Sequence, residues 1–423
     1  MALITLTCVE CSLEYDADAN RTRCDCGGLL DVSLGEPASV DRALFDQRMM
    51  SWAAPDSSGV WRYREWLPPF EASHIVSKPE GNTNLYDVPE LARWAGVDQL
   101  WLKHEGENPT GSFKDRGMTV ATSHAMRTRA TMVACASTGN TSASVAAYAA
   151  AASVPAIVFV PDGKISAAKL GQTVAYGAKI IQIRGDFDAA MTLVQQASSE
   201  LGIYLLNSIN PYRLEGQKSI LFEMLHQLGW EAPDWVILPG GNLGNSSALG
   251  KAFAELKQTG VLGRLPRMGV IQAEGASPFY EAFRSSFRAF EPMEAHTVAS
   301  AIQIGNPVSY TKAKRAIELT DGVVEIVTDD EILDAKARID QAGIGCEPAS
   351  AATLAGLRKL VQTGVVSTGD RVAGVLTGHL MKDAEVVMEY HLGAGSDQRP
   401  LANKPVVIEP TIDALRGVLT HEL

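Results

Sequence analysis

The sequence of 423 residues lacks the features of a membrane or secreted protein. No apolar run approaches the roughly 20 residues that a bilayer-spanning helix needs. The first residues, MALITLTCVECSLEYD, contain neither a basic n-region nor the A-x-A cleavage site of a signal peptide. We therefore expect a cytoplasmic protein that has no membrane partner.

Positive charge is scarce as well. The chain has 37 Lys and Arg against 49 Asp and Glu, which gives a formal net charge of −12. Nucleic acids and anionic membranes attract basic faces, so neither is an expected partner. An anionic small molecule is still compatible with this balance, because a single pocket can be locally positive.

Cysteine is rare, and a cytosolic chain of this length does not depend on disulfides. Cys135 and Cys346 stand apart, and Cys135 in the apolar run MVACAS is expected to be a small buried side chain. The other four cysteines gather near the N-terminus: Cys8, Cys11, Cys24 and Cys26. Their C-x2-C and C-x-C spacing is similar to that of a zinc ribbon, in which four thiolates hold the metal. The second pair is one residue short, so two interpretations stay open: a zinc site, or a ribbon of reduced thiols.

The chain as a whole has the composition of a globular protein, with 46% hydrophobic and 20% charged residues. Its length favours two domains. From about residue 76 to 385, short apolar runs alternate with helical patterns; TMVACAS, for example, precedes SASVAAYAAAA. Such strand–loop–helix units predict an α/β fold with parallel sheets, in which ligands bind beyond the carboxyl ends of the strands.

Three loops that follow predicted strands contain residues suited to ligands. The first, ASTGNTSAS (136–144), offers hydroxyls and free amides for a carboxylate or phosphate, although a capped helix alone would also explain it. The second, PGGNLGNSS (239–247), offers a nest of amides for a phosphate, although glycine-rich turns are common. In the third, VLTGHLMKD (375–383), a strand ends at Thr377, whose hydroxyl can bind a ring nitrogen.

The segment NPTGSFKDRG (108–117) places Lys114 in a tight turn behind Phe113. Lysine becomes a nucleophile when burial or cationic neighbours lower its pKa, and Arg116 is a candidate for such a neighbour. An exposed loop lysine is the alternative. Together with the three loops, however, Lys114 completes a pyridoxal phosphate site. Lys114 forms the Schiff base, the nest holds the phosphate, Asn140 bonds the 3-oxygen, and Thr377 faces the pyridine nitrogen.

The chain resembles the threonine synthase family of fold-type-II pyridoxal phosphate enzymes, which have the tryptophan synthase beta-like fold. The resemblance covers about residues 60–385. It rests on NPTGSFKDRGM, ASTGNTSASVAAYAA, NSINPYRLEGQKSI, GGNLGNSSALGKAF, QAEGASP, TVASAIQIGNPVSY, CEPASAATLAGL and VLTGHLMKD, in the order of the family.

The resemblance implies an α/β fold of two open twisted sheets with flanking helices, plus the small N-terminal ribbon. The expected parts are a zinc-ribbon-like element (1–34), a large cofactor-binding domain (35–118 and 212–390), a small α/β domain (119–211) and a C-terminal arm (391–423). A homodimer is expected.

The family converts O-phospho-L-homoserine and water to L-threonine and phosphate by γ-elimination and β-addition, with the lysine shuttling protons. The implied cofactor ligands are Lys114, Phe113, Asn140, Gly240, Gly241, Asn242, Leu243, Gly244 and Thr377. The implied substrate ligands are Ser137, Thr138, Asn140 and Thr141 for the carboxylate, and Asn207, Ser208 and Arg213 for the phosphate.

Two positions depart from the family pattern. Asn84 replaces a usual proline, and Leu380 replaces a usual glycine, which puts the backbone after Thr377 in doubt. Two other functions are also considered: a threonine or serine deaminase on the same fold, and a non-catalytic relative. A deaminase has no substrate phosphate for Arg213 to bind, and the intact Lys114 argues against a non-catalytic protein.

Overall fold

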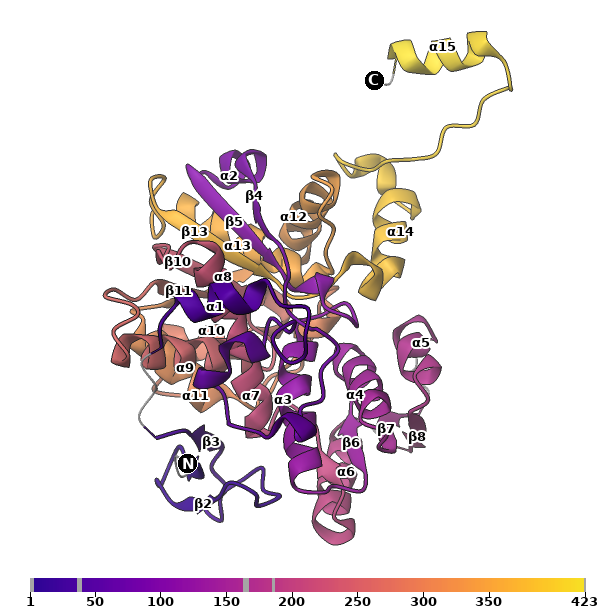
Figure 1. Ribbon diagram of the computed structural model, residues 1–423. Helices are drawn as coiled ribbons and strands as arrows, with labels where there is room; N and C mark the ends of the chain where they lie inside the picture. Colours follow the sequence, from indigo (N-terminus) through magenta and orange to yellow (C-terminus); the bar gives the residue numbers. More distant parts are fainter. Residues whose placement is uncertain (1–3, 36–39, 163–166, 185–186, 422–423) are drawn as a thin grey trace. The chain divides into compact units, whose positions relative to one another are not determined.

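Apolar runs of the sequence form three sheets in the computed structural model, which describes residues 4–35, 40–162, 167–184 and 187–421 (Figure 1). The predicted α/β class is confirmed. In the larger sheet the strand order is β12-β11-β10-β13-β5-β4. Its strands are β4 (Leu85–Asp87), β5 (Gln99–His104), β10 (Trp235–Pro239), β11 (Arg267–Ala273), β12 (Val323–Val327) and β13 (Arg371–Leu376). All neighbouring pairs are parallel except the edge pair β4–β5, which is antiparallel.

A second, parallel sheet has the order β8-β7-β6-β9. Its strands are β6 (Val133–Ala136), β7 (Ala156–Pro161), β8 (Lys179–Ile183) and β9 (Tyr204–Leu205). The N-terminal ribbon is an antiparallel sheet of order β2-β1-β3, from β1 (Thr5–Cys8), β2 (Glu14–Asp16) and β3 (Leu30–Ser33). The predicted boundaries of the ribbon, the two domains and the arm stay predictions.

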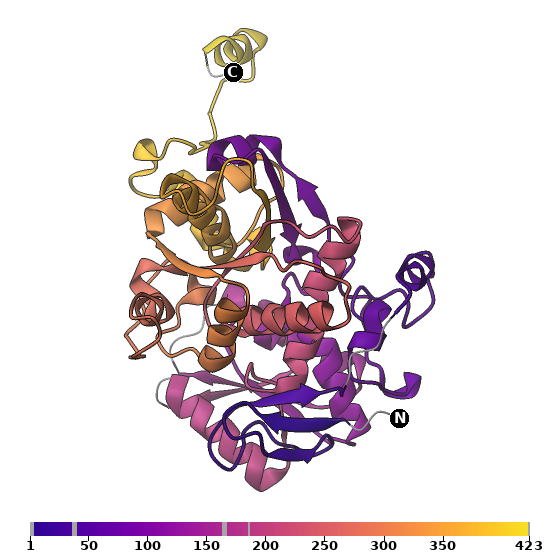
Figure 2. The ribbon, with the colours of Figure 1, turned by 90° about the vertical axis from the view of Figure 1, so that its left-hand side faces the viewer.

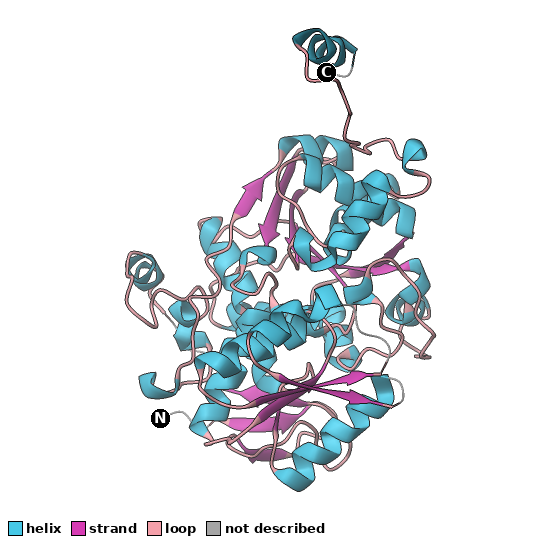
Figure 3. Ribbon diagram, turned by 90° about the vertical axis from the view of Figure 1, so that its right-hand side faces the viewer, coloured by secondary structure: helices cyan, strands magenta, loops and turns pink. Residues whose placement is uncertain are grey.

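Helices cover both faces of the larger sheet, because its strands are apolar on both sides. Trp235 and Ile237 of β10 face a core that includes α2 (Pro89–Ala95), α12 (Asp329–Gln341) and α13 (Pro348–Gln362). The alternate residues Val236 and Leu238 face a core that includes α8 (Ser219–Gln227), α9 (Gly244–Gln258) and α11 (Tyr310–Leu319). Figure 3 shows these strands, in magenta, between cyan helices.

The second sheet is covered in the same way. Val133 and Cys135 of β6 pack with residues of α3 (Lys114–Arg127), α4 (Asn140–Ala151) and the ribbon. Ala134 and Ala136 pack with α6 (Phe187–Leu201) on the other face. Cys135 is fully buried, as expected. Figure 2 shows the indigo ribbon beside this lower part of the chain.

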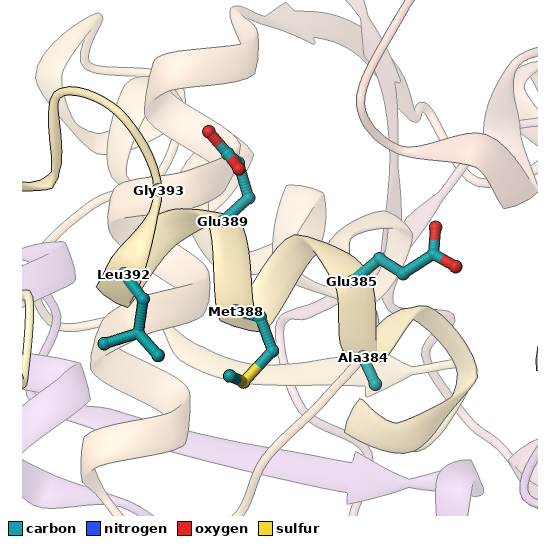
Figure 4. A pocket seen from close by; sticks show the side chains of 6 residues that line it. All are labelled: Ala384, Glu385, Met388, Glu389, Leu392 and Gly393. Atoms are coloured by element: carbon teal, nitrogen blue, oxygen red, sulfur yellow. The ribbon is translucent and has the colours of Figure 1, made fainter.

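Residues 384–423 form a separate compact unit. It holds α14 (Ala384–Leu392) and α15 (Ile412–His421). A surface recess along α14 is lined by Ala384, Glu385, Met388, Glu389, Leu392 and Gly393 (Figure 4). None of these residues belongs to the predicted site. Among the described residues, no helix is both long and apolar enough to cross a membrane.

Two glycines let α3 and α7 (Pro211–Gln217) cross closely. A Cβ built on Gly216 would lie 1.8 Å from the Arg116 carbonyl oxygen and 2.9 Å from the Gly117 Cα. A Cβ on Gly117 would lie 2.7 Å from the Arg213 carbonyl oxygen. The crossing brings the helix that begins at Lys114 against the helix that contains Arg213.

We therefore predict that Gly216→Ala destabilises the protein by about 3 kcal/mol, because backbone atoms cannot yield as a flexible side chain does. Gly171→Ala in α5 (Ala167–Ala175) is the matched control, since its new Cβ meets no atom within 4 Å. The control should be neutral or stabilising by up to ~1 kcal/mol. Urea unfolding measures both, and equal midpoints for the two variants would contradict the close crossing.

Candidate active site

Backbone hydrogen bonds fix the loop that precedes Lys114 against the end of β13. The Phe113 amide donates to the Thr377 carbonyl (3.0 Å), and the His379 amide donates to the Gly111 carbonyl (3.0 Å). Between these bonds, Ser112 pairs with Gly378 in an antiparallel bridge. Lys114 is the first residue of α3, so this docking brings its side chain beside the loop after β13.

The neighbouring Asp115 stabilises the same turn. Its carboxylate accepts hydrogen bonds from the Thr110 amide (2.7 Å), the Thr110 hydroxyl (2.7 Å) and the Ser144 hydroxyl of α4 (2.6 Å). Burial raises the pKa of Asp115 to about 6. Asp115 therefore stabilises the turn that begins at Thr110 and joins it to α4, which is a structural role.

Arg116 lies in a fully buried cluster of charges. Its guanidinium forms a bidentate pair with Glu105 (2.6 and 2.7 Å) and donates to Glu223 (2.8 Å). Lys103 donates to the same Glu223 oxygen (2.6 Å). Arg116 is therefore committed to this cluster, and the cationic neighbour that lowers the pKa of Lys114 is Arg213 instead.

The Lys114 amine is a weak base here. Burial is the largest cause and the Arg213 charge adds to it, while Glu347 opposes both, so that the pKa falls to about 7. Nζ lies 3.9 Å from the centre of the Phe113 ring. Above pH ~7 the amine is neutral, and it then has the free electron pair that a nucleophile needs.

Glu347 is a member of the site that sequence reasoning missed. Its buried carboxylate accepts hydrogen bonds from the Asn140 side-chain amide (2.9 Å) and the Thr377 hydroxyl (3.2 Å). Burial raises its pKa. In the segment CEPAS, a glutamate before a proline is typical of a solvated helix start. The one signal for Glu347 was that CEPASAATLAGL is among the motifs that carry the family resemblance.

Thr377 itself is held by α13. Its amide donates to the Ser350 hydroxyl (2.8 Å), and the two hydroxyl oxygens lie 3.0 Å apart. The side chains assigned to the cofactor ring, Asn140 and Thr377, thus share Glu347 as a partner although they come from different sheets.

The glycine-rich loop after β10 forms the predicted nest of amides. In the described part of the chain, the backbone N–H groups of residues 241–246 donate to no protein atom. They lie at the start of the 15-residue helix α9, where the helix dipole favours an anion. The phosphate of pyridoxal phosphate fits these donors. Leu243 has φ 63°, which turns the chain into the helix.

Packing explains two of the glycines in this loop. A Cβ on Gly240 would lie 2.5 Å from Val270 Cγ1, and one on Gly241 would lie 3.0 Å from the Ile302 Cα. The small residues thus let the loop approach neighbouring protein segments. Gly244, by contrast, has only ordinary contacts around a new Cβ.

The loop 137–141 follows β6 and leads into α4. The Ser137 hydroxyl accepts from the Gly139 amide (3.3 Å), and the Ser142 hydroxyl donates to the Gly139 carbonyl (2.8 Å). The backbone N–H groups of Thr138, Asn140 and Thr141 have no hydrogen-bond acceptor among the described residues. These partly exposed N–H groups can donate hydrogen bonds to a carboxylate.

Arg213 on α7 carries unused donors. Its Nη1 donates to the Leu206 carbonyl (3.2 Å), but the buried Nε and Nη2 have no partner in the part of the chain that is described. Burial lowers the pKa of Arg213 to about 10, so the group remains charged at neutral pH. A buried guanidinium with two free donors fits an anion.

The other two residues predicted for the phosphate are engaged with protein. The Ser208 hydroxyl accepts a hydrogen bond from the Asn242 side-chain amide (2.6 Å), which connects the loop after β9 directly to the glycine-rich loop after β10. The Asn207 side-chain amide accepts a hydrogen bond from the Ala136 N–H and donates one to the Ala136 carbonyl (2.9 Å each). Asn207 therefore secures the end of β6, and Arg213 is the member of this group with free donors.

Both departures from the family pattern are accommodated. The Asn84 amide donates to Glu107 (2.6 Å), a bond that proline could not make. Leu380 begins a 3-10 turn, is absent from the residues with positive φ, and packs on Gly345. The backbone after Thr377 therefore needs no glycine at Leu380.

Residues 76–378 match the family model described as pyridoxal-phosphate dependent enzyme. The threonine synthase of Methanocaldococcus jannaschii is 44% identical over 97% of this chain and 98% of its own length. That of Methanosarcina acetivorans is 46% identical over 98% of both chains. Among solved structures, threonine deaminase isoform 2 from Solanum lycopersicum has a TM-score of 0.65 at 19% identity, over 85% of this chain and 96% of that one. This last likeness concerns the fold alone.

We predict that attachment of pyridoxal phosphate to the cofactor-free protein accelerates from pH 6 to 8 and levels off above. The reactive fraction is the neutral amine, and the depressed pKa of about 7 means that this fraction saturates just above neutral pH. An ordinary lysine, with a pKa of about 10.4, would still gain rate at pH 9. Stopped-flow absorbance measures the rate.

Two variants should shift the midpoint of this pH dependence in opposite directions and so serve as matched controls. Glu347→Gln removes the charge that raises the pKa of Lys114, so the midpoint should fall, while Arg213→Gln should raise it, each by about one unit. A wild-type midpoint above pH 9, or shifts of the same sign in both variants, would show that the amine lies in another environment.

Proposed function

This chain belongs to the pyridoxal-phosphate dependent enzyme family, and we infer that it acts as a threonine synthase that converts O-phospho-L-homoserine and water to L-threonine and phosphate. The near full-length identity to curated threonine synthases supports this assignment. Within the site, one observation favours the reaction over others on the same fold: the buried Arg213 guanidinium with two free donors.

The cofactor would be held by residues already described. Lys114 supplies the amine, the amides of 241–246 bind the phosphate, and Asn140 and Thr377 bind the ring. When bound, pyridoxal phosphate supplies the electron sink that stabilises negative charge at the substrate Cα. Glu347 keeps the Asn140 and Thr377 side chains oriented toward one place.

The Lys114 amine is suited to move protons. A group with a pKa near 7 both accepts and returns a proton at neutral pH, which makes it an efficient general acid and base. We assign to Lys114 the removal of the Cα proton and the proton transfers at Cβ that γ-elimination and water addition require. The neighbouring Phe113 ring limits water around the amine.

The substrate has two anionic ends, and the site has two places for them. The loop 137–141, with its free amides, would bind the carboxylate. Arg213 would bind the phosphate through Nε and Nη2 and stabilise the charge that builds on this group as it leaves. A homodimer and a cytoplasmic location remain predictions.

A deaminase on the same fold is the main alternative, and its substrate has no phosphate. We predict that purified protein releases phosphate and threonine from O-phospho-L-homoserine. Arg213→Lys keeps the charge beside Lys114 but loses the fork of donors, so kcat/KM should fall roughly 100-fold. Arg93→Gln, whose side chain is 76% exposed on α2, is the control and should retain full activity.

Coupled assays for phosphate and amino-acid analysis for threonine give the readout. Formation of 2-oxobutyrate from threonine, without phosphate release from O-phospho-L-homoserine, would assign a deaminase instead. A protein that takes up no pyridoxal phosphate and stays colourless would be a non-catalytic relative.

A further inference from the structure

The four N-terminal cysteines converge on one point. Cys8 ends β1, Cys11 lies in the turn that follows, and Cys24 and Cys26 lie in the turn before β3. Their sulfur atoms all lie within 4.8 Å of one another, with 3.5 Å between Cys8 and Cys26 and between Cys11 and Cys24. A tetrahedral zinc site with bonds of about 2.3 Å has sulfurs about 3.8 Å apart, whereas a disulfide has them about 2.05 Å apart.

The backbone around the sulfurs has the form of a metal knuckle. The Glu10 amide points at the Cys8 sulfur (3.4 Å), and the Gly27 amide closes the second turn on the Cys24 carbonyl (2.9 Å). Gly27 has φ 86°, which permits the tighter C-x-C turn. The short spacing of the second pair therefore still directs both thiols inward.

A tyrosine hydroxyl contacts the cysteine cluster, as polar groups beside metal ligands do. The Tyr15 hydroxyl lies 3.1 Å from the Cys24 sulfur and accepts from the Asp25 amide (2.9 Å), so it donates to the sulfur. Such hydrogen bonds orient thiolate ligands. A Cβ on Gly28 would lie 2.8 Å from the Cys8 sulfur, so glycine is required where the chain passes the cluster.

The ribbon is joined to the helix that contains Arg213. The Tyr212 hydroxyl donates to the Ala17 carbonyl (2.5 Å), and the Tyr212 ring stacks on His124 at 3.6 Å. His124 Nε2 lies 2.9 Å from the same Ala17 oxygen. The residue next to Arg213 is therefore fixed by the ribbon backbone.

The edge strand of the ribbon is held from the other side by lysines. Lys312 of α11 donates to the Leu30 carbonyl (2.6 Å) and pairs with Asp31 (2.7 Å). Lys251 of α9 contacts both the Val32 carbonyl and Glu215, which lies on α7. The ribbon thus contacts α7 directly and through α9.

We propose that Cys8, Cys11, Cys24 and Cys26 bind one zinc ion as four thiolates, and that this metal keeps the ribbon folded as a brace for α7 and Arg213. Zinc or iron is the metal that four sulfur ligands in tetrahedral arrangement select. Zinc is favoured here because four cysteines on two turns of a small ribbon are a common structural zinc site. The brace rests on the proposed role of Arg213, whereas the metal site does not.

Metal analysis of holoenzyme purified without chelator tests the site first. The expected result is one zinc per chain in the wild type and in Cys135→Ala, a buried cysteine outside the cluster, and loss of zinc in the Cys11→Ser/Cys26→Ser variant. Cobalt substitution of the wild type, read by the absorption of tetrahedral cobalt thiolate, keeps the test independent of variant folding. Iron at one per chain, or no metal after zinc is added to reduced protein, would overturn the proposal.

Binding of inorganic phosphate tests the brace. Calorimetry on holoenzyme, whose nest is filled by pyridoxal phosphate, compares zinc-loaded with zinc-stripped wild type. We expect phosphate to bind roughly tenfold more weakly without zinc, because a misplaced positioning group costs one to two orders of magnitude, while the cofactor absorbance stays unchanged. Equal affinities would overturn the brace and leave the metal site. Absence of phosphate binding even with zinc loaded would instead count against the proposed role of Arg213.

Discussion

The buried Arg116 guanidinium is the interaction on which the placement of the site depends. The Arg116 side chain is fully buried and forms ion pairs with Glu105, which follows β5, and with Glu223 on α8. Lys103 forms a further ion pair with Glu223. Two cations and two carboxylates neutralise one another there, which is the condition under which buried charges are tolerated. Because Arg116 lies two residues after Lys114, the cluster fixes the start of α3 to the larger sheet and thereby fixes the amine.

The site itself is assembled from two sheets. The larger sheet contributes the loops after β10 and β13 and the start of α13, and the second sheet contributes the loops after β6 and β9. Two hydrogen bonds join these halves: Asn140 to Glu347, and Asn242 to Ser208. Burial is the largest cause of the lowered pKa of Lys114, and the charges of Arg213 and Glu347 act on this pKa in opposite directions.

Local sequence patterns predicted the parts of the site but not their partners. Strand–loop–helix units located the loops around Asn140, Gly241 and Thr377, the turn-rich segment NPTGSFKDRG pointed to Lys114, and the family resemblance pointed to Arg213. Glu347 escaped because its two contacts, to Asn140 and Thr377, join residues far apart in the chain, and such pairings leave no local pattern. For the same reason the sequence suggested Arg116 as the cation that lowers the pKa of Lys114, whereas in the structure that cation is Arg213. The cysteine spacing, being local, indicated the ribbon directly.

The central claim is that Lys114 holds the cofactor, and borohydride reduction of the holoenzyme followed by peptide mapping tests it most directly. Reduction fixes pyridoxal phosphate to whichever amine binds it. The account predicts one phosphopyridoxyl group per chain on the peptide that contains Lys114. Lys382 is the informative competitor, because it is partly buried beside Gly111 and its pKa is also lowered by burial. A label on Lys382, or on any lysine other than Lys114, would contradict the account.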